Sequence, residues 1–140
     1  MKVEYLFLAD AGMAQRESGL FTVLNGGINL VRCPKFPGGL HSVFLLGRIS
    51  FDPDESAEKH WVDAEIVSPG GQILEPAFRG LELSPGQSEL GADKRPELTL
   101  ALTFQSIVFP NAGTFAFRIL KSGTTEELGR TTIEVLPLEV

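Results

Sequence analysis

The stretch from Leu98 to Gln105 reads LTLALTFQ, and it places a large apolar side chain at every second position. Successive side chains of a β-strand point to opposite faces of its sheet, so this alternation gives the strand one continuous apolar face. The same period of two recurs in residues 3–10, 115–120 and 132–135. No segment repeats apolar residues at helical spacing, and the best helical candidate is the single turn at 54–59. The sequence therefore predicts an all-β protein.

Glycine and proline separate these alternating segments. The chain of 140 residues holds 15 glycines and 9 prolines, which gather mainly at residues 25–27, 34–39, 69–71, 76–96 and 121–123. Short strands joined by turns at this spacing are typical of a β-sandwich. We therefore predict a single-domain antiparallel β-sandwich over residues 1–140, with about eight or nine strands in an Ig-like or C2-like arrangement. The proline-rich region 76–96 is expected to be an irregular connection between the sheets.

Charge and the character of the N-terminal segment exclude several classes of function. Eighteen acidic against 12 basic side chains give a net charge of −6, which opposes binding to a phosphate backbone. The uncharged apolar run from Tyr5 to Ala9 is too short for a signal peptide or a membrane helix. The only cysteine, Cys33, can form no intramolecular disulfide and is interpreted as a small buried apolar residue. We expect a cytoplasmic protein that binds no nucleic acid and does not insert into membranes.

Motifs that carry catalysis are absent from the sequence. The chain has no Gly-x-Ser-x-Gly, no His-Glu-x-x-His, no phosphate-binding glycine loop and no Cys-x-x-Cys. Its two histidines, His41 and His60, belong to no recognisable nucleophile or metal motif. We therefore expect no enzymatic activity, no catalytic residues and no cofactor.

The most acidic stretch of the chain runs from Asp52 to Glu58. Asp52, Asp54 and Glu55 are candidate metal ligands, because calcium binds carboxylate and carbonyl oxygens gathered in a flexible loop. The competing interpretation is a solvated turn in which aspartates accept hydrogen bonds from nearby backbone amides. The EF-hand pattern, which would favour calcium, is absent.

Trp61 lies in the predicted strand from His60 to Val67. The apolar residues 62, 64 and 66 share one face of that strand, so Trp61 shares the opposite face with two carboxylates. An outward tryptophan can stack on a sugar ring or anchor a protein partner. The competing interpretation is that Trp61 lies at the margin of the sheet beneath a loop, for instance the one at 34–39.

Strands in the N-terminal half are apolar on both faces. Phe21 and Val23 oppose other apolar residues of their strand, and Phe44 and Leu46 oppose those of theirs. A large uncovered apolar face is a liability on a monomer. Two explanations stay open, namely that the chain's own long loop covers the second face or that another subunit does. Phe21, Val23, Phe44, Leu46 and Trp61 are therefore the candidate contacts for a partner.

Segments at both ends of the chain resemble a known family. Residues 5–11 read YLFLADA, residues 19–28 read GLFTVLNGGI, and a loop with two prolines follows at 34–37. Residues 113–119 and 136–140 fit the same pattern. The chain is similar to an uncharacterised family of small bacterial all-β proteins, which open with an "ADxA"-like strand and a "GKLNVLGG"-like hairpin. The resemblance implies an all-β fold and no established activity, so it carries over no catalytic residues.

The sequence favours a binding protein over an enzyme. The leading hypothesis is a non-enzymatic module that binds a protein partner or associates with itself as a homo-oligomer. The alternative is a ligand-binding module, for a carbohydrate or a calcium-dependent surface, that uses Trp61 and the acidic loop 52–58. The exposure of Trp61 and Phe44 in a structure is the most informative observation within the protein.

Overall fold

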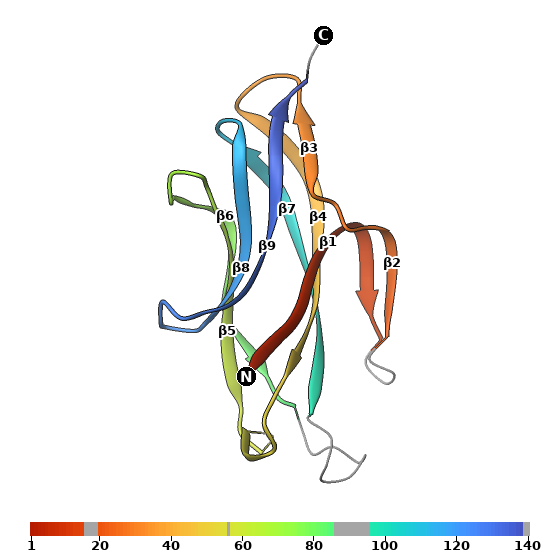
Figure 1. The fold of residues 1–140 in the computed structure, drawn as a ribbon, viewed down its shortest axis with the longest axis vertical. Helices are drawn as coiled ribbons and strands as arrows, with labels where there is room; N and C mark the ends of the chain where they lie inside the picture. The colour runs from red at the N-terminus through yellow and green to blue at the C-terminus, as the bar shows by residue number, and fades with distance from the viewer. Residues whose placement is uncertain (16–19, 56, 86–95, 139–140) are drawn as a thin grey trace.

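Nine β-strands make up nearly all regular structure in the described part of this computed structural model, which comprises residues 1–15, 20–55, 57–85 and 96–138 (Figure 1). Those residues include no α-helix, and one 3₁₀ turn, η1 (Pro53–Glu55), overlaps the start of the predicted helical turn at 54–59. The strands are β1 (Lys2–Ala14), β2 (Phe21–Gly26), β3 (Leu30–Cys33), β4 (Gly38–Ser50), β5 (His60–Val67), β6 (Ile73–Leu83), β7 (Glu97–Phe109), β8 (Gly113–Lys121) and β9 (Glu127–Pro137). The all-β prediction and the expected number of strands are confirmed.

The strands form two sheets that face each other (Figure 1). Sheet A has the strand order β2-β1-β4-β7, and sheet B has the order β3-β9-β8-β5-β6. Every described pairing is antiparallel except that of β3 with β9, which is parallel. This is the β-sandwich that the sequence predicts, with one parallel pair added at the edge of sheet B.

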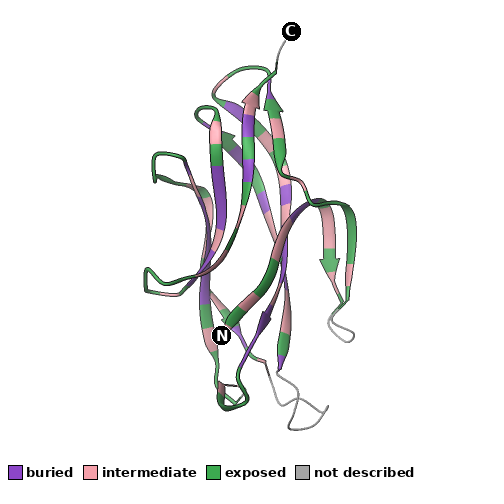
Figure 2. Cartoon of the chain, in the orientation of Figure 1, coloured by how far each residue is buried: buried purple, intermediate pink, exposed green. Residues whose placement is uncertain are grey.

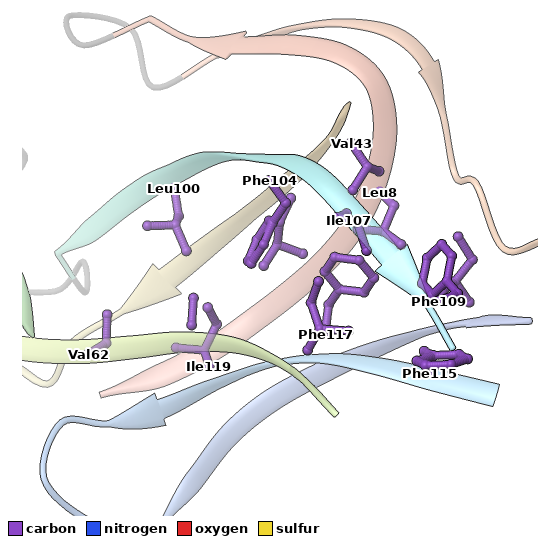
Figure 3. Packing of buried hydrophobic residues seen from close by; sticks show 14 of the residues in the cluster. Leu8, Val43, Val62, Leu100, Phe104, Ile107, Phe109, Phe115, Phe117 and Ile119 are labelled. Atoms are coloured by element: carbon purple, nitrogen blue, oxygen red, sulfur yellow. The ribbon is translucent and has the colours of Figure 1, made fainter. Parts of the chain in front are cut away.

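The hydrophobic core lies between the two sheets (Figure 3). Phe104 of sheet A and Phe117 of sheet B meet edge to face, with their ring centroids 5.2 Å apart. The alternation of apolar residues in their strands predicts that both side chains face the core. Beyond Phe104 the alternation shifts by one residue at Ser106, which has a left-handed φ of 56°. Ile107 and Phe109 therefore also face the core, although strict alternation would turn them outward.

β1 changes both partner and direction halfway along its length. Its first half, up to Ala9, pairs with β4, whereas its second half pairs with β2. In Figure 1 the strand rises from the N-terminus, bends, and descends beside β2. At the bend, Nδ2 of Asn25 donates a 2.7 Å hydrogen bond to Oδ2 of Asp10, and Asn25 adopts a left-handed φ of 52°. The described residues 10–15 and 20–26 thus form an N-terminal hairpin that folds back over sheet A.

Aromatic side chains anchor the N-terminal hairpin on the outer face of sheet A. The ring of Phe21 lies 6.0 Å from that of Phe7 and 6.3 Å from that of Tyr5. Closer to the bend, a Cβ atom at Gly12 would lie 2.7 Å from Cδ1 of Leu46, so the absence of a side chain permits this close approach. Leu46 is consequently fully buried. The chain therefore covers much of its own second apolar face, and it does so with this hairpin.

The segment that was expected to be an irregular connection begins as a strand. β6 runs through Pro76 and Gly80 and pairs with β5. Proline is tolerated there because β6 is the outermost strand of sheet B, where an N–H on the open side has no ladder partner. The prediction of irregular structure is therefore wrong for residues 76–83, and residues 86–95 lie outside the described part of the chain.

Candidate functional site

The N-terminal hairpin turns one side toward sheet A and the other toward solvent. Gly12 and Phe21 contact sheet A, and side chains at alternating positions point the opposite way. Three large apolar side chains on that opposite side are exposed, with 60% of Met13, 60% of Leu20 and 61% of Leu24 open to solvent. Figure 2 accordingly shows β2 mostly in the colour of exposed residues. We name this outward side, which carries Met13, Leu20, Thr22 and Leu24, the hairpin face.

The hairpin face carries no charge in its described residues. Residues 11–15 and 20–26 include no Asp, Glu, Lys or Arg. Charged side chains are a common device for keeping exposed strands from pairing with other chains, and exposed apolar patches mark interaction sites. Burying one Leu or Met side chain contributes about 1.5–3 kcal/mol. An uncharged apolar face held on a fastened hairpin is therefore chemically suited to contact another protein.

The side chains singled out for partner contact differ in their exposure. Leu46 is fully buried under the hairpin, so its selection as a contact residue is wrong for this conformation. Phe21 and Phe44 are half-buried, and the ring of Phe21 packs inward against sheet A. Val23 is 37% exposed and Trp61 is 49% exposed. The candidate residues on β2, Phe21 and Val23, therefore lie on an exposed edge strand. They belong, however, to the side of that strand that faces sheet A.

Met13, Leu20 and Leu24 are the apolar residues that this selection left out. The available signal was that both sides of the segment 20–24 are apolar. The pattern could not tell which side is covered, because that depends on the bend of β1 at Asp10 and on ring contacts between Phe21 and residues far from it in sequence.

A cleft of about 470 Å³ lies beside the N-terminal residue, Met1, which is one of its lining residues. Trp61 lines this cleft together with residues from η1, the start of β5 and the turn between β8 and β9, among them Glu55, Glu58, His60, Lys121 and Glu126. The predicted outward direction of Trp61 agrees with its exposure, and the alternative that a loop covers it is wrong. The cleft thus brings Trp61 and two glutamates of the acidic loop together.

Glu55 is engaged in contacts within the protein. Its Oε1 and Oε2 accept hydrogen bonds from the terminal ammonium of Met1 at 2.7 and 2.9 Å, and Oε1 also accepts one from the backbone N–H of Asp52 at 2.9 Å. The ammonium above all, and then the Asp52 amide, hold the pKa of Glu55 below its ordinary value. Within the described residues, no three His, Cys, Asp or Glu side chains group as metal ligands. The metal hypothesis for Asp52, Asp54 and Glu55 therefore gains no support from the geometry.

Glu65, one of the two carboxylates that share the outer face with Trp61, is buried and paired. It is 2% exposed. Its Oε1 accepts hydrogen bonds from Nε and Nη2 of Arg118 at 2.8 and 2.6 Å, and its Oε2 accepts one from Nη2 of Arg79 at 2.8 Å. Burial alone would raise the pKa of Glu65, but the two guanidinium groups outweigh burial and hold that pKa below its ordinary value.

Asp63, the other carboxylate, is satisfied in a similar way. Its Oδ1 accepts hydrogen bonds from the backbone N–H of Gly80 at 2.8 Å and from the hydroxyl of Ser122 at 3.0 Å. Burial would raise its pKa, but these hydrogen bonds and the charge of Arg79 leave that pKa below its ordinary value. The outer face of sheet B therefore carries a network of ion pairs and hydrogen bonds in which both carboxylates are satisfied, and not an open acidic site beside Trp61.

These features define a two-sheet all-β protein with an uncharged apolar hairpin face and a polar cleft beside an exposed tryptophan. The chain belongs to a family of unknown function, DUF6941, whose model matches residues 4–136. The resemblance to an uncharacterised all-β family is thereby confirmed. A comparison with curated proteins gives no match. Among the described residues, no helix has the length and apolar character needed to cross a membrane.

Proposed function

We propose that this chain is a non-enzymatic protein-binding module whose contact surface is the hairpin face. The observation that carries the proposal is the exposure of Met13, Leu20 and Leu24 on one side of a hairpin whose other side is already buried. If the hairpin served only to cover sheet A, apolar side chains on its solvent-facing side would add nothing to the stability of the fold. Large apolar side chains that stay exposed are best explained by a surface that is covered on binding.

The hairpin is also held in place before any partner arrives. The Asn25–Asp10 hydrogen bond fastens its bend, and the Phe21 ring fastens its far end to Tyr5 and Phe7. A contact element fixed in its binding conformation loses less conformational entropy on association. The N-terminal hairpin therefore has the properties of a pre-organised contact element.

The proposal is tested by the size of the complexes that contain the protein in extracts of cells that express it naturally. We expect the wild-type chain to elute well above its 15.2 kDa monomer mass. Leu24→Glu should elute as a monomer, because the new charge would have to be desolvated in the contact. Ile73→Glu is the matched control, since Ile73 is also an exposed apolar residue, 49% open, but lies on β6 of sheet B. Monomeric elution of the wild type, or equal loss of the complex in both variants, contradicts the proposal.

A second candidate function is saccharide binding in the cleft beside Trp61. The observation that favours it is the placement of an exposed indole with Glu58, Glu126 and Lys121, which form no ion pair with the described residues. The apolar face of a sugar ring stacks on an indole, and carboxylates and ammonium groups hydrogen-bond to its hydroxyls.

Glycan-array screening, followed by fluorescence titration of the single tryptophan, tests this candidate. We expect a bound glycan to shift the emission of Trp61, and Trp61→Ala to lose array binding. Glu65→Gln is the control for a general effect on sheet B, because Glu65 does not line the cleft. An array without binding above background removes this candidate.

A further inference from the structure

β2 is the outermost strand of sheet A, so one of its two backbone edges is open. Gln15 N–H donates a 2.8 Å hydrogen bond to the carbonyl of Leu20, which fixes the alternation of the β1–β2 ladder. In an antiparallel pair the hydrogen-bonded positions recur at every second residue. Thr22 and Leu24 therefore direct their N–H and C=O groups toward β1. The backbone groups of Phe21 and Val23 point to the open edge.

The strands at the other three ends of the two sheets, β6, β3 and β7, carry features that discourage pairing with another chain. β6 contains Pro76 and the charged Glu75, Arg79 and Glu82. β3 pairs over only four residues and contains Arg32. β7 lies against β6 of the opposite sheet, and it contains the left-handed Ser106.

β2, by contrast, contains neither a proline nor a charged residue. Natural proteins protect edge strands with charges, prolines, bulges or covering elements. Charges and prolines are absent from the described residues of β2, and its left-handed residue Asn25 lies beyond Phe21 and Val23. The open edge at Phe21 and Val23 is therefore suited to accept another strand.

We propose that β2 pairs in an antiparallel direction with β2 of a second copy of this chain, around a two-fold axis near Val23. The pairing joins the two N-terminal hairpins into one four-stranded sheet and sets the two hairpin faces side by side. The inference rests on the proposed function, since it names the partner of the same hairpin.

Charge is the argument for a second copy as the partner. Each copy carries a net charge of −6, so most approaches of two copies bring like charges together. The described hairpin residues 11–15 and 20–26 are uncharged, so an approach along β2 avoids that repulsion. The hairpin face has no charged side chain that could pair with an oppositely charged partner.

Side-chain positions in the paired state also agree with a two-fold arrangement. With Val23 opposite Val23 of the second copy, Thr22 lies opposite Leu24 of the second copy, and the reverse holds by symmetry. Both members of that pair belong to the hairpin face, so each exposed Leu24 gains a neighbour on an already apolar surface. The interface is short compared with a standard one of about 1,600 Å², so we expect a dimer that forms with rising protein concentration.

Cysteine cross-linking of the full chain tests this register. Val23→Cys places two thiols opposite each other at the two-fold axis, within the Cα separation that a disulfide spans. Under mild oxidation with diamide we expect it to give a covalent dimer at least ten times faster than Val108→Cys. Val108 is the matched control, since it is 53% exposed on β7, the other edge strand of sheet A. The native Cys33 is 1% exposed and does not compete.

Sedimentation of the purified chain provides the second measurement. The wild-type mass should rise from 15.2 kDa toward twice that value with concentration. Val23→Pro removes an N–H from the open edge only, so it should stay monomeric at every concentration while its far-UV spectrum is unchanged. Leu24→Glu, an exposed position that folding does not need, should weaken the dimer at least tenfold.

Two outcomes overturn the inference. The first is a dimer that survives Val23→Pro, or cross-linking that is equally fast from Val23→Cys and Val108→Cys, because either result places the contact elsewhere. The second is a wild type that stays monomeric when pure. If such a monomer still elutes in a large complex from cell extract, and Leu24→Glu abolishes that complex, the proposed function stands and only the second copy is excluded.

Discussion

Glu65 is a carboxylate that the fold places almost out of reach of water on the outer face of sheet B. Arg118 of β8 and Arg79 of β6 reach it from the strands on either side of β5. A buried ion pair is weak evidence of net stabilisation, but removing one partner leaves a buried charge without compensation. Stability at this position therefore depends on both guanidinium groups.

Arg118→Met should lower the free energy of unfolding by about 3 kcal/mol, because Glu65 would lose two of its three hydrogen bonds from arginine. Arg130→Met is the matched control. Arg130 lies on the neighbouring β9 with its side chain 49% exposed and pairs with Glu127, so its loss should cost no more than about 1 kcal/mol. Urea unfolding of both variants measures the difference. Equal effects would show that Glu65 does not depend on Arg118.

The same network predicts how stability depends on pH. The folded pKa of Glu65 lies below its ordinary value of 4.5. A carboxylate with a depressed folded pKa stabilises the fold above its unfolded pKa, and this contribution disappears as the pH falls through the folded pKa. The contribution of Glu65 to the free energy of unfolding should therefore be constant above about pH 5.5. Below that pH, this contribution should decrease as the pH falls. Glu65→Gln should flatten the curve in that acidic range, and a slope as steep as in the wild type would contradict this assignment.

At the scale of elements, the N-terminal hairpin shows what a local pattern can and cannot predict. The alternation of residues 3–10 and the apolar residues at 20–24 indicated two strands, and the structure has a strand at each place. The fold-back could not be predicted, because it depends on contacts between Phe21 and Tyr5 and between Gly12 and Leu46, which are distant in sequence. For the same reason the pattern could not separate the covered side of β2 from the hairpin face.

Other elements differ from the pattern for local reasons. Pro76 suggested irregular structure, but an edge position lets β6 continue through it. The alternation of residues 98–105 ends at Ser106, whose positive φ no alternation rule includes. The sequence placed Trp61 on the correct side of β5, since Val62, Ala64 and Ile66 face the core and Trp61 is exposed. The pattern could not show that the two carboxylates beside it are paired, because the arginines that contact them come from other strands.

A substitution at Gly12 tests whether the N-terminal hairpin packs against Leu46. Gly12→Ala places a Cβ 2.7 Å from Cδ1 of the buried Leu46, so the hairpin or Leu46 must shift, and we expect a loss of about 1–3 kcal/mol in urea unfolding. Gly39→Ala is the matched control in the same sheet, because its nearest neighbour, the carbonyl oxygen of Ile107, lies at an ordinary 3.7 Å. We expect Gly39→Ala to change stability by less than about 0.5 kcal/mol. Equal stability of the two variants would mean that Gly12 of the hairpin does not pack closely against Leu46.

At the scale of the whole molecule, charged and apolar surfaces are separated. The outer face of sheet B is an ion-pair network around Glu65, and the cleft at Trp61 is lined by charged side chains. Apart from Asp10 at its bend, the described hairpin is uncharged, and its residues Met13, Leu20 and Leu24 are exposed. A net charge of −6 keeps most of the surface solvated and repels other copies, and this repulsion is weakest at the uncharged hairpin residues 11–15 and 20–26.

Photo-cross-linking in living cells tests this account most directly. A benzophenone amino acid in place of Leu24 sits on the hairpin face, and one in place of Ile73 sits at a comparably exposed apolar position on sheet B. Irradiation should link position 24, but not position 73, to one defined protein, and the additional change Met13→Glu should abolish the product. The absence of any adduct from position 24, or the same adducts from both positions, would contradict the claim that the hairpin face is the contact surface.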